Sequence, residues 1–262
     1  LLSLTLAVSF LSIQTLAQGT TFQDTVAKID QLFKDWNTHT PGGALTVSRQ
    51  GEIIYHKAFG MADLEHHIAN TTKTIFEAGS VSKQFTTTAI FLLAMEGKLS
   101  LDDEVRKYIP ELPDYGDKLT IRHMIHHISG LRDWGSVASI SGWSRGLRTH
   151  TQAHALEILS RQKALNFPPG DQYSYCNSGY NLMAILVDRL SGMPFAEFCK
   201  KRIFEPMGMH DTQWRDDYRK IVPNRSIAYT RSNGVYLQDM PFEMAHGNGG
   251  LLTTTADLVK WN

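Results

Sequence analysis

The sequence changes to a helical pattern at residues 79–86, which read Gly79-Ser80-Val81-Ser82-Lys83-Gln84-Phe85-Thr86. Apolar residues then recur on one helical face from Phe85 to Leu93, and Gly97 is a natural helix stop. Ser80 and Lys83 are three residues apart, so a helix brings their side chains to one face. A lysine in that position can take the hydroxyl proton that a nucleophilic serine must lose. The stretch therefore predicts a long helix with an activated serine, Ser80, at its start.

The Ser-x-x-Lys spacing is weak evidence by itself, because about one match arises by chance in a chain of this size and composition. A second match lies at Ser160 and Lys163. Ser80 opens a helix, where free N–H groups and the positive end of the helix dipole stabilise negative charge. Ser160 instead comes late in a predicted helix beside Arg161, which is typical of a solvated helix face. The position in the helix thus favours Ser80.

Before this stretch, the sequence predicts a helix followed by a hairpin. Apolar residues between Phe22 and Trp36 recur at helical spacing with charged residues between them, which predicts an amphipathic helix. Two extended runs, residues 44–48 and 53–59, are joined by a short connection that contains Gly51 and predict an antiparallel hairpin. An isolated hairpin needs further strands or a packed helix. We expect its missing partners to lie beyond Asn262.

After the long helix, short predicted helices dominate up to about residue 245, at residues 120–127, 151–162, 178–190 and 194–204. The tetrad Thr254-Thr255-Ala256-Asp257 matches a capping box that opens one more helix. The predicted organisation is a leader at residues 1–17, the N-terminal part of an α/β subdomain at 18–82, a mainly helical subdomain at 83–245, and the start of a return to the α/β subdomain at 246–262.

A second chemical element is Tyr175-Cys176-Asn177, the only Tyr-x-Asn in the chain. A phenol beside an ammonium group can shuttle protons. Alternate residues of an extended segment point to the same side, so the Asn177 amide can hold a substrate carbonyl there. The alternative is a packed tyrosine and an asparagine that caps the following helix.

Both elements closely resemble the serine β-lactamase-like family, which includes class C β-lactamases, DD-peptidases and related esterases. The resemblance continues through Gly60-Met61-Ala62-Asp63-Leu64-Glu65, Gly97-Lys98-Leu99-Ser100-Leu101-Asp102-Asp103, His127-Ile128-Ser129-Gly130-Leu131, Pro206-Met207-Gly208-Met209 and Gly249-Gly250-Leu251-Leu252-Thr253-Thr254. It covers nearly all of residues 20–262. The fold that it implies is of the α+β type, an antiparallel sheet flanked by helices with an inserted all-helical subdomain.

The resemblance also implies roles for four residues. Ser80 would be the acylated nucleophile, Lys83 its activating partner, Tyr175 a proton shuttle and Asn177 a ligand on the carbonyl side of the substrate. Whether Lys83 or Tyr175 takes the first proton stays open. The family's third motif, a Lys- or His-led triplet that ends in Gly, is not found in this sequence. We therefore expect the C-terminal strands to be missing from this chain, which would leave it weakly active or inactive.

Composition and charge exclude several partners. The chain has 26 Lys and Arg against 26 Asp and Glu, a formal net charge of +0 and 42% hydrophobic residues, which is typical of a globular domain. Nucleic acid is not expected as a partner, because the sequence has no cluster of basic residues that could bind a phosphate backbone.

The run from Leu1 to Ala17 is almost continuously apolar and ends in Thr15-Leu16-Ala17. This pattern predicts a signal peptide, incomplete at its start, and export to the periplasm or medium. An uncleaved membrane anchor is the alternative.

Histidines and cysteines give weaker signals. His123, His126 and His127 could share a metal on a helix, but no Glu of the His-Glu-x-x-His type accompanies them, which favours a structural or solvated role. Cys176 and Cys199 allow one disulfide, and two small buried thiols are the favoured alternative.

The sequence thus predicts an exported serine hydrolase that forms an acyl-enzyme on an amide or ester carbonyl, without a metal or organic cofactor. Its partner would be a small-molecule or peptide substrate: a β-lactam, a D-Ala-ended peptide, another peptide or an ester. Two alternatives stay open. One is a non-catalytic peptidoglycan- or penicillin-binding protein on the same scaffold, and the other is a metallohydrolase that uses the histidine stretch. The oligomeric state is not predicted.

Overall fold

The computed structural model describes residues 22–144, 148–240 and 242–262, so the predicted leader at residues 1–17 lies outside the described residues. The chain divides into two compact units between Asp35 and Trp36. In the first unit, α1 (Phe22–Leu32) is the predicted amphipathic helix, and its residues are exposed or half-buried. The second unit contains the other described helices and strands.

The predicted hairpin consists of β1 (Gly43–Arg49) and β2 (Glu52–Phe59), which pair antiparallel. The connecting residues Gln50 and Gly51 both have positive φ angles, 51° and 80°, a turn geometry whose twist matches that of paired strands. The helix opened by Thr254, α8 (Thr255–Trp261), contacts both strands. A hydrogen bond of 2.6 Å joins the side chains of Thr46 and Thr255. The hairpin therefore packs on a helix from within the described chain.

Short strands that the sequence analysis missed bring distant segments together. β9 (Leu251–Thr253) pairs antiparallel with both β5 (Phe76–Glu77) and β6 (Gln213–Trp214). Two further antiparallel pairs join β3 (Met61–Asp63) to β4 (Ile68–Ala69), and β7 (Tyr229–Ser232) to β8 (Val235–Gln238). Strands of two to four residues carry too little alternation to be recognised in a sequence. Through β9, the residues before position 251 come to lie beside the start of the long helix.

The predicted long helix is α2 (Lys83–Met95), which follows a 3₁₀ turn, η1 (Gly79–Ser82), and ends before Gly97. The predicted short helices also form, and the structure adds α4 (Trp134–Ile140) and a 3₁₀ turn, η2 (Val105–Lys107). The others are α3 (Ile121–Ile125), α5 (Gln152–Ser160), α6 (Ser178–Ser191) and α7 (Phe195–Cys199), which continues as the π-helical turn η3 (Lys200–Phe204).

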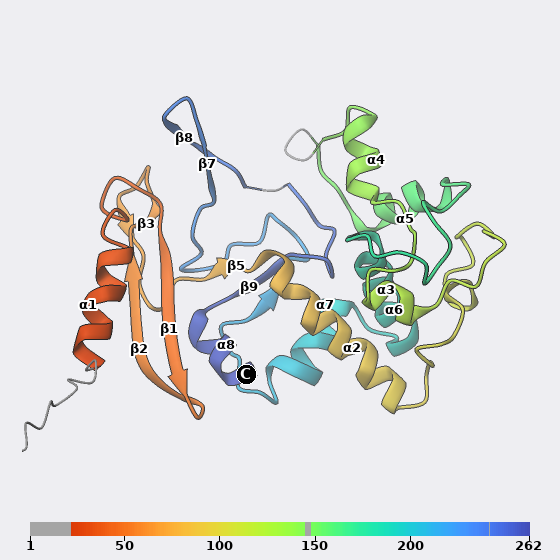
Figure 1. The fold of residues 1–262 in the computed structure, drawn as a ribbon, viewed down its shortest axis with the longest axis horizontal. Helices are drawn as coiled ribbons and strands as arrows, with labels where there is room; N and C mark the ends of the chain where they lie inside the picture. The colour runs from red at the N-terminus through yellow and green to blue at the C-terminus, as the bar shows by residue number, and fades with distance from the viewer. Residues whose placement is uncertain (1–21, 145–147, 241) are drawn as a thin grey trace, which may run out of the picture. The chain divides into compact units, whose positions relative to one another are not determined.

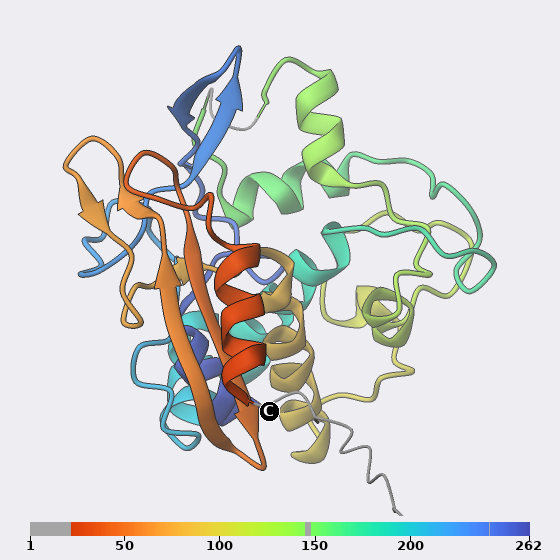
Figure 2. The same ribbon diagram turned by 60° about the vertical axis from the view of Figure 1, so that its left-hand side comes forward.

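Helices α2 and α6 form the centre of the hydrophobic core. Phe85, Ile90 and Leu93 of α2 are fully buried, and α6 buries every residue from Ser178 to Val187. Within the second unit, α2 lies between the β1–β2 hairpin and helices α3 to α6 (Figure 1), and the turned view in Figure 2 agrees. Ser80 and Lys83 lie at the start of α2 and Asn177 at the start of α6. The core therefore holds together the two helix starts that carry the predicted site.

Candidate active site

The turn that carries Ser80 is tied to β9. Gly79 has a φ angle of 51°, a left-handed conformation that favours glycine. The Ala78 amide donates to the Leu251 carbonyl at 2.8 Å, and the Leu251 amide donates to Ser82 Oγ at 3.1 Å. Ser82 itself is buried and donates to the Gly79 carbonyl. The Ser82 hydroxyl thus stabilises the turn through these two hydrogen bonds, whereas Ser80 is exposed to solvent.

Lys83 is buried, and oxygen atoms surround its side-chain nitrogen. The residue is 7% exposed, and Nζ donates to Ser80 Oγ at 3.1 Å, to Asn177 Oδ1 at 2.9 Å and to the Asn248 carbonyl at 2.6 Å. Three oxygen atoms from different segments thus surround Nζ and fix its position. The predicted contact between Ser80 and Lys83 is therefore present, and partners from α6 and from the segment before β9 hold it in place.

Tyr175 also contacts the Ser80 hydroxyl, and the two oxygens are 2.6 Å apart. The tyrosine is about half exposed, and its ring lies under Lys83 Nζ, 4.9 Å from the ring centroid. His127 packs against the same ring, with 4.5 Å between the centroids. The predicted residues Ser80, Lys83 and Tyr175, which are up to 95 positions apart, thus meet within hydrogen-bonding distance of one hydroxyl group.

His127 fixes the backbone beside Tyr175. Its Nδ1 accepts a hydrogen bond of 3.1 Å from the Cys176 amide. Burial, together with the nearby positive charge of Lys83, lowers the pKa of His127 below its usual value. The lowered pKa keeps the imidazole neutral, which leaves Nδ1 free to act as an acceptor. His127, the last residue of the histidine stretch, therefore makes a structural contact with the backbone beside Tyr175. Among the described residues, the structure contains no group of three or more His, Cys, Asp or Glu placed to hold a metal ion.

Asn177 is oriented from both ends of its amide. Oδ1 accepts from Lys83, while Nδ2 and the backbone amide donate to Asp133 Oδ2 at 3.1 and 2.9 Å. Asp133 also caps α4, because its Oδ1 accepts from the Ser136 amide at 3.0 Å. Sequence reasoning missed Asp133 and Asn248. The sequence offered one hint of Asp133, which lies two residues after His127–Leu131, a segment that carries the family resemblance.

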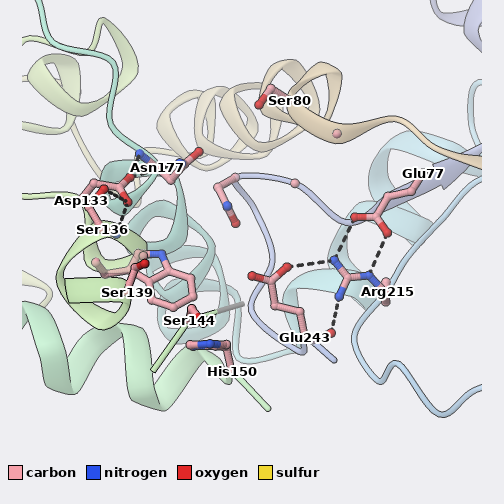
Figure 3. A pocket seen from close by; sticks show the side chains of 15 residues that line it. Glu77, Ser80, Asp133, Ser136, Ser139, Ser144, His150, Asn177, Arg215 and Glu243 are labelled. Atoms are coloured by element: carbon pink, nitrogen blue, oxygen red, sulfur yellow. Dashed lines mark hydrogen bonds and ion pairs between the residues drawn. The ribbon is translucent and has the colours of Figure 1, made fainter. Parts of the chain in front are cut away.

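A cavity of about 550 Å³ opens beside Ser80 and Asn177. Figure 3 shows Asp133 and Ser136 on one wall, Glu77, Arg215 and Glu243 on another, and His150 between them. Glu77 binds the Arg215 guanidinium group through two contacts, of 3.0 and 3.2 Å. The candidate nucleophile therefore borders a space large enough for a small-molecule or peptide group, with polar and charged walls.

Two other predictions can be placed. In the second Ser-x-x-Lys match, the Ser160 hydroxyl donates to the Glu157 carbonyl of its own helix at 2.8 Å, and Lys163 is exposed. Cys176 and Cys199 are both free and buried, which confirms small buried thiols and not a disulfide. Burial raises the pKa of both thiols. Among the described residues, no helix combines the length and the hydropathy needed to cross a bilayer.

Known proteins resemble this chain in sequence and in structure. A penicillin-binding protein of Bacillus subtilis is 33% identical over 191 residues, which are 73% of this chain and 41% of that protein. A D-aminopeptidase of Brucella ovis is 35% identical over 228 residues, 86% of this chain and 42% of that protein. The chain thus spans less than half the length of either relative.

Among solved structures, the octameric penicillin-binding protein homologue from Pyrococcus abyssi superposes with a TM-score of 0.79 at 27% identity, over 90% of this chain and 55% of that chain. The D-amino acid amidase from Ochrobactrum anthropi, at 21% identity and a TM-score of 0.73, shares the fold over 88% of this chain and 69% of that chain. The family model described as Beta-lactamase matches residues 22–262. On this match, which includes both helix starts of the candidate site, the chain belongs to the β-lactamase family.

Proposed function

We propose that this protein is a serine hydrolase that forms an acyl-enzyme on an amide or ester carbonyl, with Ser80 as the nucleophile. The observation that carries the proposal is the Ser80 hydroxyl, which lies 3.1 Å from Lys83 Nζ and 2.6 Å from the Tyr175 hydroxyl. A nucleophile with two proton-transferring groups in reach has the arrangement that covalent catalysis needs. Membership of the β-lactamase family supports the same chemistry.

The reaction would proceed in two halves. Ser80 Oγ attacks the carbonyl carbon, and its proton passes to Lys83 in its neutral amine form or to Tyr175 in its phenolate form. The tetrahedral intermediate then collapses, and the leaving amine or alcohol takes up that proton as its bond to carbon breaks. Water attacks the resulting ester, and its proton follows the reverse path to the Ser80 oxygen. Which of Lys83 and Tyr175 accepts the first proton stays open, because both contact the same oxygen.

Asn177 would orient the substrate. Its Nδ2 carries two hydrogens, of which one serves Asp133. The second can donate to a substrate carbonyl in the cavity. Because Lys83 and Asp133 hold the amide from both ends, this donor needs no reorganisation when the substrate binds, which is the advantage of a preorganised polar site.

We also propose that the protein is exported, on the basis of the apolar run from Leu1 to Ala17 and its small-x-small end. Expression of the natural gene with fractionation of the cells tests this, and the N-terminal sequence of the exported protein should begin near Gln18. Retention of the intact leader in a membrane fraction would favour an anchor.

The test of the catalytic proposal is active-site labelling of the natural full-length protein. A fluorophosphonate probe should add its mass to one peptide, the peptide that contains Ser80, and the Ser80→Ala variant should remain unlabelled. Penicillin serves as a second probe. A penicillin adduct that forms at Ser80 and persists, without turnover of any ester, would favour the penicillin-binding alternative. Labelling that is unchanged in Ser80→Ala would overturn the proposal.

A further inference from the structure

We propose that Arg215 is a positioning residue for the active site and that it acts through Lys83. Its guanidinium group and its backbone tie residues 243–250, the segment that supplies one acceptor of Lys83, to the strand that leads to Ser80. The inference rests on the proposed function, because Ser80 and Lys83 are taken as the catalytic pair. It adds a residue whose contacts, among those described, reach neither of them.

Arg215 is anchored on one side by a carboxylate close to the nucleophile. It follows β6 directly, and its side chain is 2% exposed. Nε and Nη2 donate to the two carboxylate oxygens of Glu77, at 3.2 and 3.0 Å, a two-point contact that fixes the orientation of the guanidinium plane. Glu77 is the last residue of β5 and lies three positions before Ser80. One end of the connection is therefore the strand that enters the Ser80 turn.

On its other side, Arg215 binds both ends of residues 243–250. Nη1 donates to the Glu243 carbonyl, and the Arg215 amide donates to the Gly250 carbonyl at 2.7 Å. Figure 3 shows the guanidinium group between Glu77 and Glu243. One residue thus fixes both ends of this segment and sets its position relative to β5.

The segment between those ends carries the backbone acceptors of the site. Three consecutive carbonyl groups accept hydrogen bonds from side chains of α2 and α6. They belong to His246, which accepts from Asn181 Nδ2 at 2.9 Å, Gly247, which accepts from Thr86 Oγ1 at 2.7 Å, and Asn248, which accepts from Lys83 Nζ at 2.6 Å. A carbonyl oxygen lies in the plane of its peptide group and moves only with the backbone. A shift of the segment therefore displaces an acceptor of Lys83 directly.

The shape of the arginine matters here more than its charge. A buried ion pair is weak evidence for stability, because the cost of desolvation offsets much of the attraction. A lysine can neutralise Glu77 equally well, but it has no planar fork of donors to bind the carboxylate at two points and a carbonyl at a third. Arg215→Lys therefore retains the charge and removes the geometry that holds residues 243–250.

The experiment measures labelling of Ser80 by a fluorophosphonate probe in the natural full-length protein, as kinact and KI. Misplacement of a reacting group by about 1 Å can cost about 10²-fold in rate, so we expect Arg215→Lys to lower kinact at least about tenfold. Arg215 also lines the cavity beside Ser80. A change confined to KI would mean that Arg215 contacts the ligand itself, and it would overturn the positioning role.

Arg189→Lys is the matched control. Arg189 is in the last turn of α6 and also binds a glutamate at two points, Glu111 at 2.6 and 3.0 Å, and a backbone carbonyl, that of Tyr108 at 2.8 Å. The same donors are lost in both substitutions, but Arg189 has no assigned link to the site. Arg189→Lys should retain the kinact of the wild type.

A double-mutant cycle separates positioning from general damage to the fold. In a Lys83→Met background, Arg215→Lys should change kinact less than about twofold, because the group that it positions is absent. These proteins are labelled at saturating probe over hours, since Lys83→Met is itself slow. An equal loss in both backgrounds overturns the inference, and so does a wild-type kinact in Arg215→Lys.

Thermal unfolding of each variant is measured first. Should Arg215→Lys fail to fold, Glu77→Gln, which preserves the shape of the carboxylate side chain, enters the same cycle with the same criterion. Failure of both to fold overturns the inference, because the pair would then serve the fold as a whole. Labelling also separates the two proposals. An adduct at Ser80 that forms equally fast in Arg215→Lys rejects the positioning role alone, whereas the absence of an adduct in the wild type rejects the proposed function.

Discussion

The chain contains the same tetrad twice, and only one copy is built into a site. Ser80 and Lys83 stand at the start of α2, whereas Ser160 is the last residue of α5 and Lys163 lies beyond its end. In the first copy the amine and the hydroxyl are 3.1 Å apart, and Lys83 is buried. In the second, Ser160 donates to the Glu157 carbonyl and Lys163 is exposed.

The difference lies in the partners that come from elsewhere in the chain. Asn177 and Asn248 supply two of the three acceptors of Lys83, and the Tyr175 hydroxyl also contacts Ser80. In the second copy, Ser160 binds the Glu157 carbonyl and Arg161 pairs with the Glu157 side chain, and the contact from a distant residue, Arg132, goes to Gln162 and not to Ser160 or Lys163. Local spacing brings a serine and a lysine together, but distant residues are needed to fix the geometry of a nucleophile.

The largest contrast is expected for the two serines. Ser80→Ala should lower kcat/KM for ester and amide substrates by at least about 10⁴-fold, because no other group can form the acyl-enzyme. Ser160→Ala should retain wild-type rates. Steady-state kinetics on both purified variants checks this, and a loss of rate in Ser160→Ala equal to that in Ser80→Ala would remove the distinction between the two copies.

The two lysines form the next pair. Lys83→Met preserves the length of a buried side chain but removes the ammonium group, and we expect about a 10³-fold loss of kcat. Lys163→Met should change kcat less than about twofold, since no role in proton transfer is assigned to it. Thermal unfolding of Lys83→Met must accompany the kinetics, because a folded and fully active Lys83→Met would contradict the proposed role.

Tyr175 distinguishes the first copy from the second, which has no such group assigned to it. Tyr175→Phe removes the hydroxyl that lies 2.6 Å from Ser80 and retains the ring against His127. We expect about a 10²-fold loss of kcat, the usual scale for one proton-transferring group. The pH profile of kcat is the discriminating measurement: a change of rate without any change of profile would indicate a packing role.

Asp133 tests whether support at a distance matters. It touches Asn177 and not Ser80 in the contacts described. Asp133→Asn keeps a good helix cap for α4 but leaves one acceptor oxygen where the carboxylate had two. We expect about a tenfold loss of kcat/KM through misplacement of the Asn177 amide. Unchanged kinetics would show that Lys83 alone is sufficient to orient Asn177.

The smallest effect concerns His127 and pH. Its pKa in the folded protein lies below the ordinary value of 6.5, so the unfolded chain binds more protons and stability is lost as the pH falls through and below 6.5. His127→Asn keeps an acceptor for the Cys176 amide and tolerates the φ angle of 57°. Between pH 7 and pH 5 the wild type should lose about 2 °C more in Tm than the variant. His123 and His246 also have lowered pKa values, but both are present in the wild type and in the variant, so their contributions to the difference in Tm cancel. Parallel Tm losses would remove this role of His127.

Sequence reasoning reached the parts of the molecule that depend on local pattern. The β1–β2 hairpin, α2 and the helix start at Thr254 were predictable from alternation, apolar spacing and capping residues. Ser80 and Lys83 were predictable together because one helical turn contains both. Tyr175 and Asn177 gained their expected roles from a resemblance, and the structure places the Tyr175 hydroxyl 2.6 Å from Ser80 Oγ and Asn177 Oδ1 2.9 Å from Lys83 Nζ.

Other features depend on tertiary structure and left no signal. Asn248 contributes its backbone carbonyl to Lys83, and a carbonyl carries no side-chain signature. The strands β5, β6 and β9 are two or three residues long and exist because they pair with one another. His127 acquires its contact with Cys176 through a left-handed backbone angle that histidine rarely adopts. The ring nitrogens of His150, which have no partner among the described residues, could be identified only from coordinates.

The contact between Lys83 and Asn248 has a consequence for synthesis. These residues are 165 positions apart, so a growing chain exposes Ser80 and Lys83 early but completes their surroundings late. Contacts between positions so far apart form slowly and cooperatively. A nascent polypeptide therefore cannot close the contact between Lys83 and Asn248 until nearly all of this sequence has left the ribosome, so labelling of Ser80 by an active-site probe would also report that folding is complete.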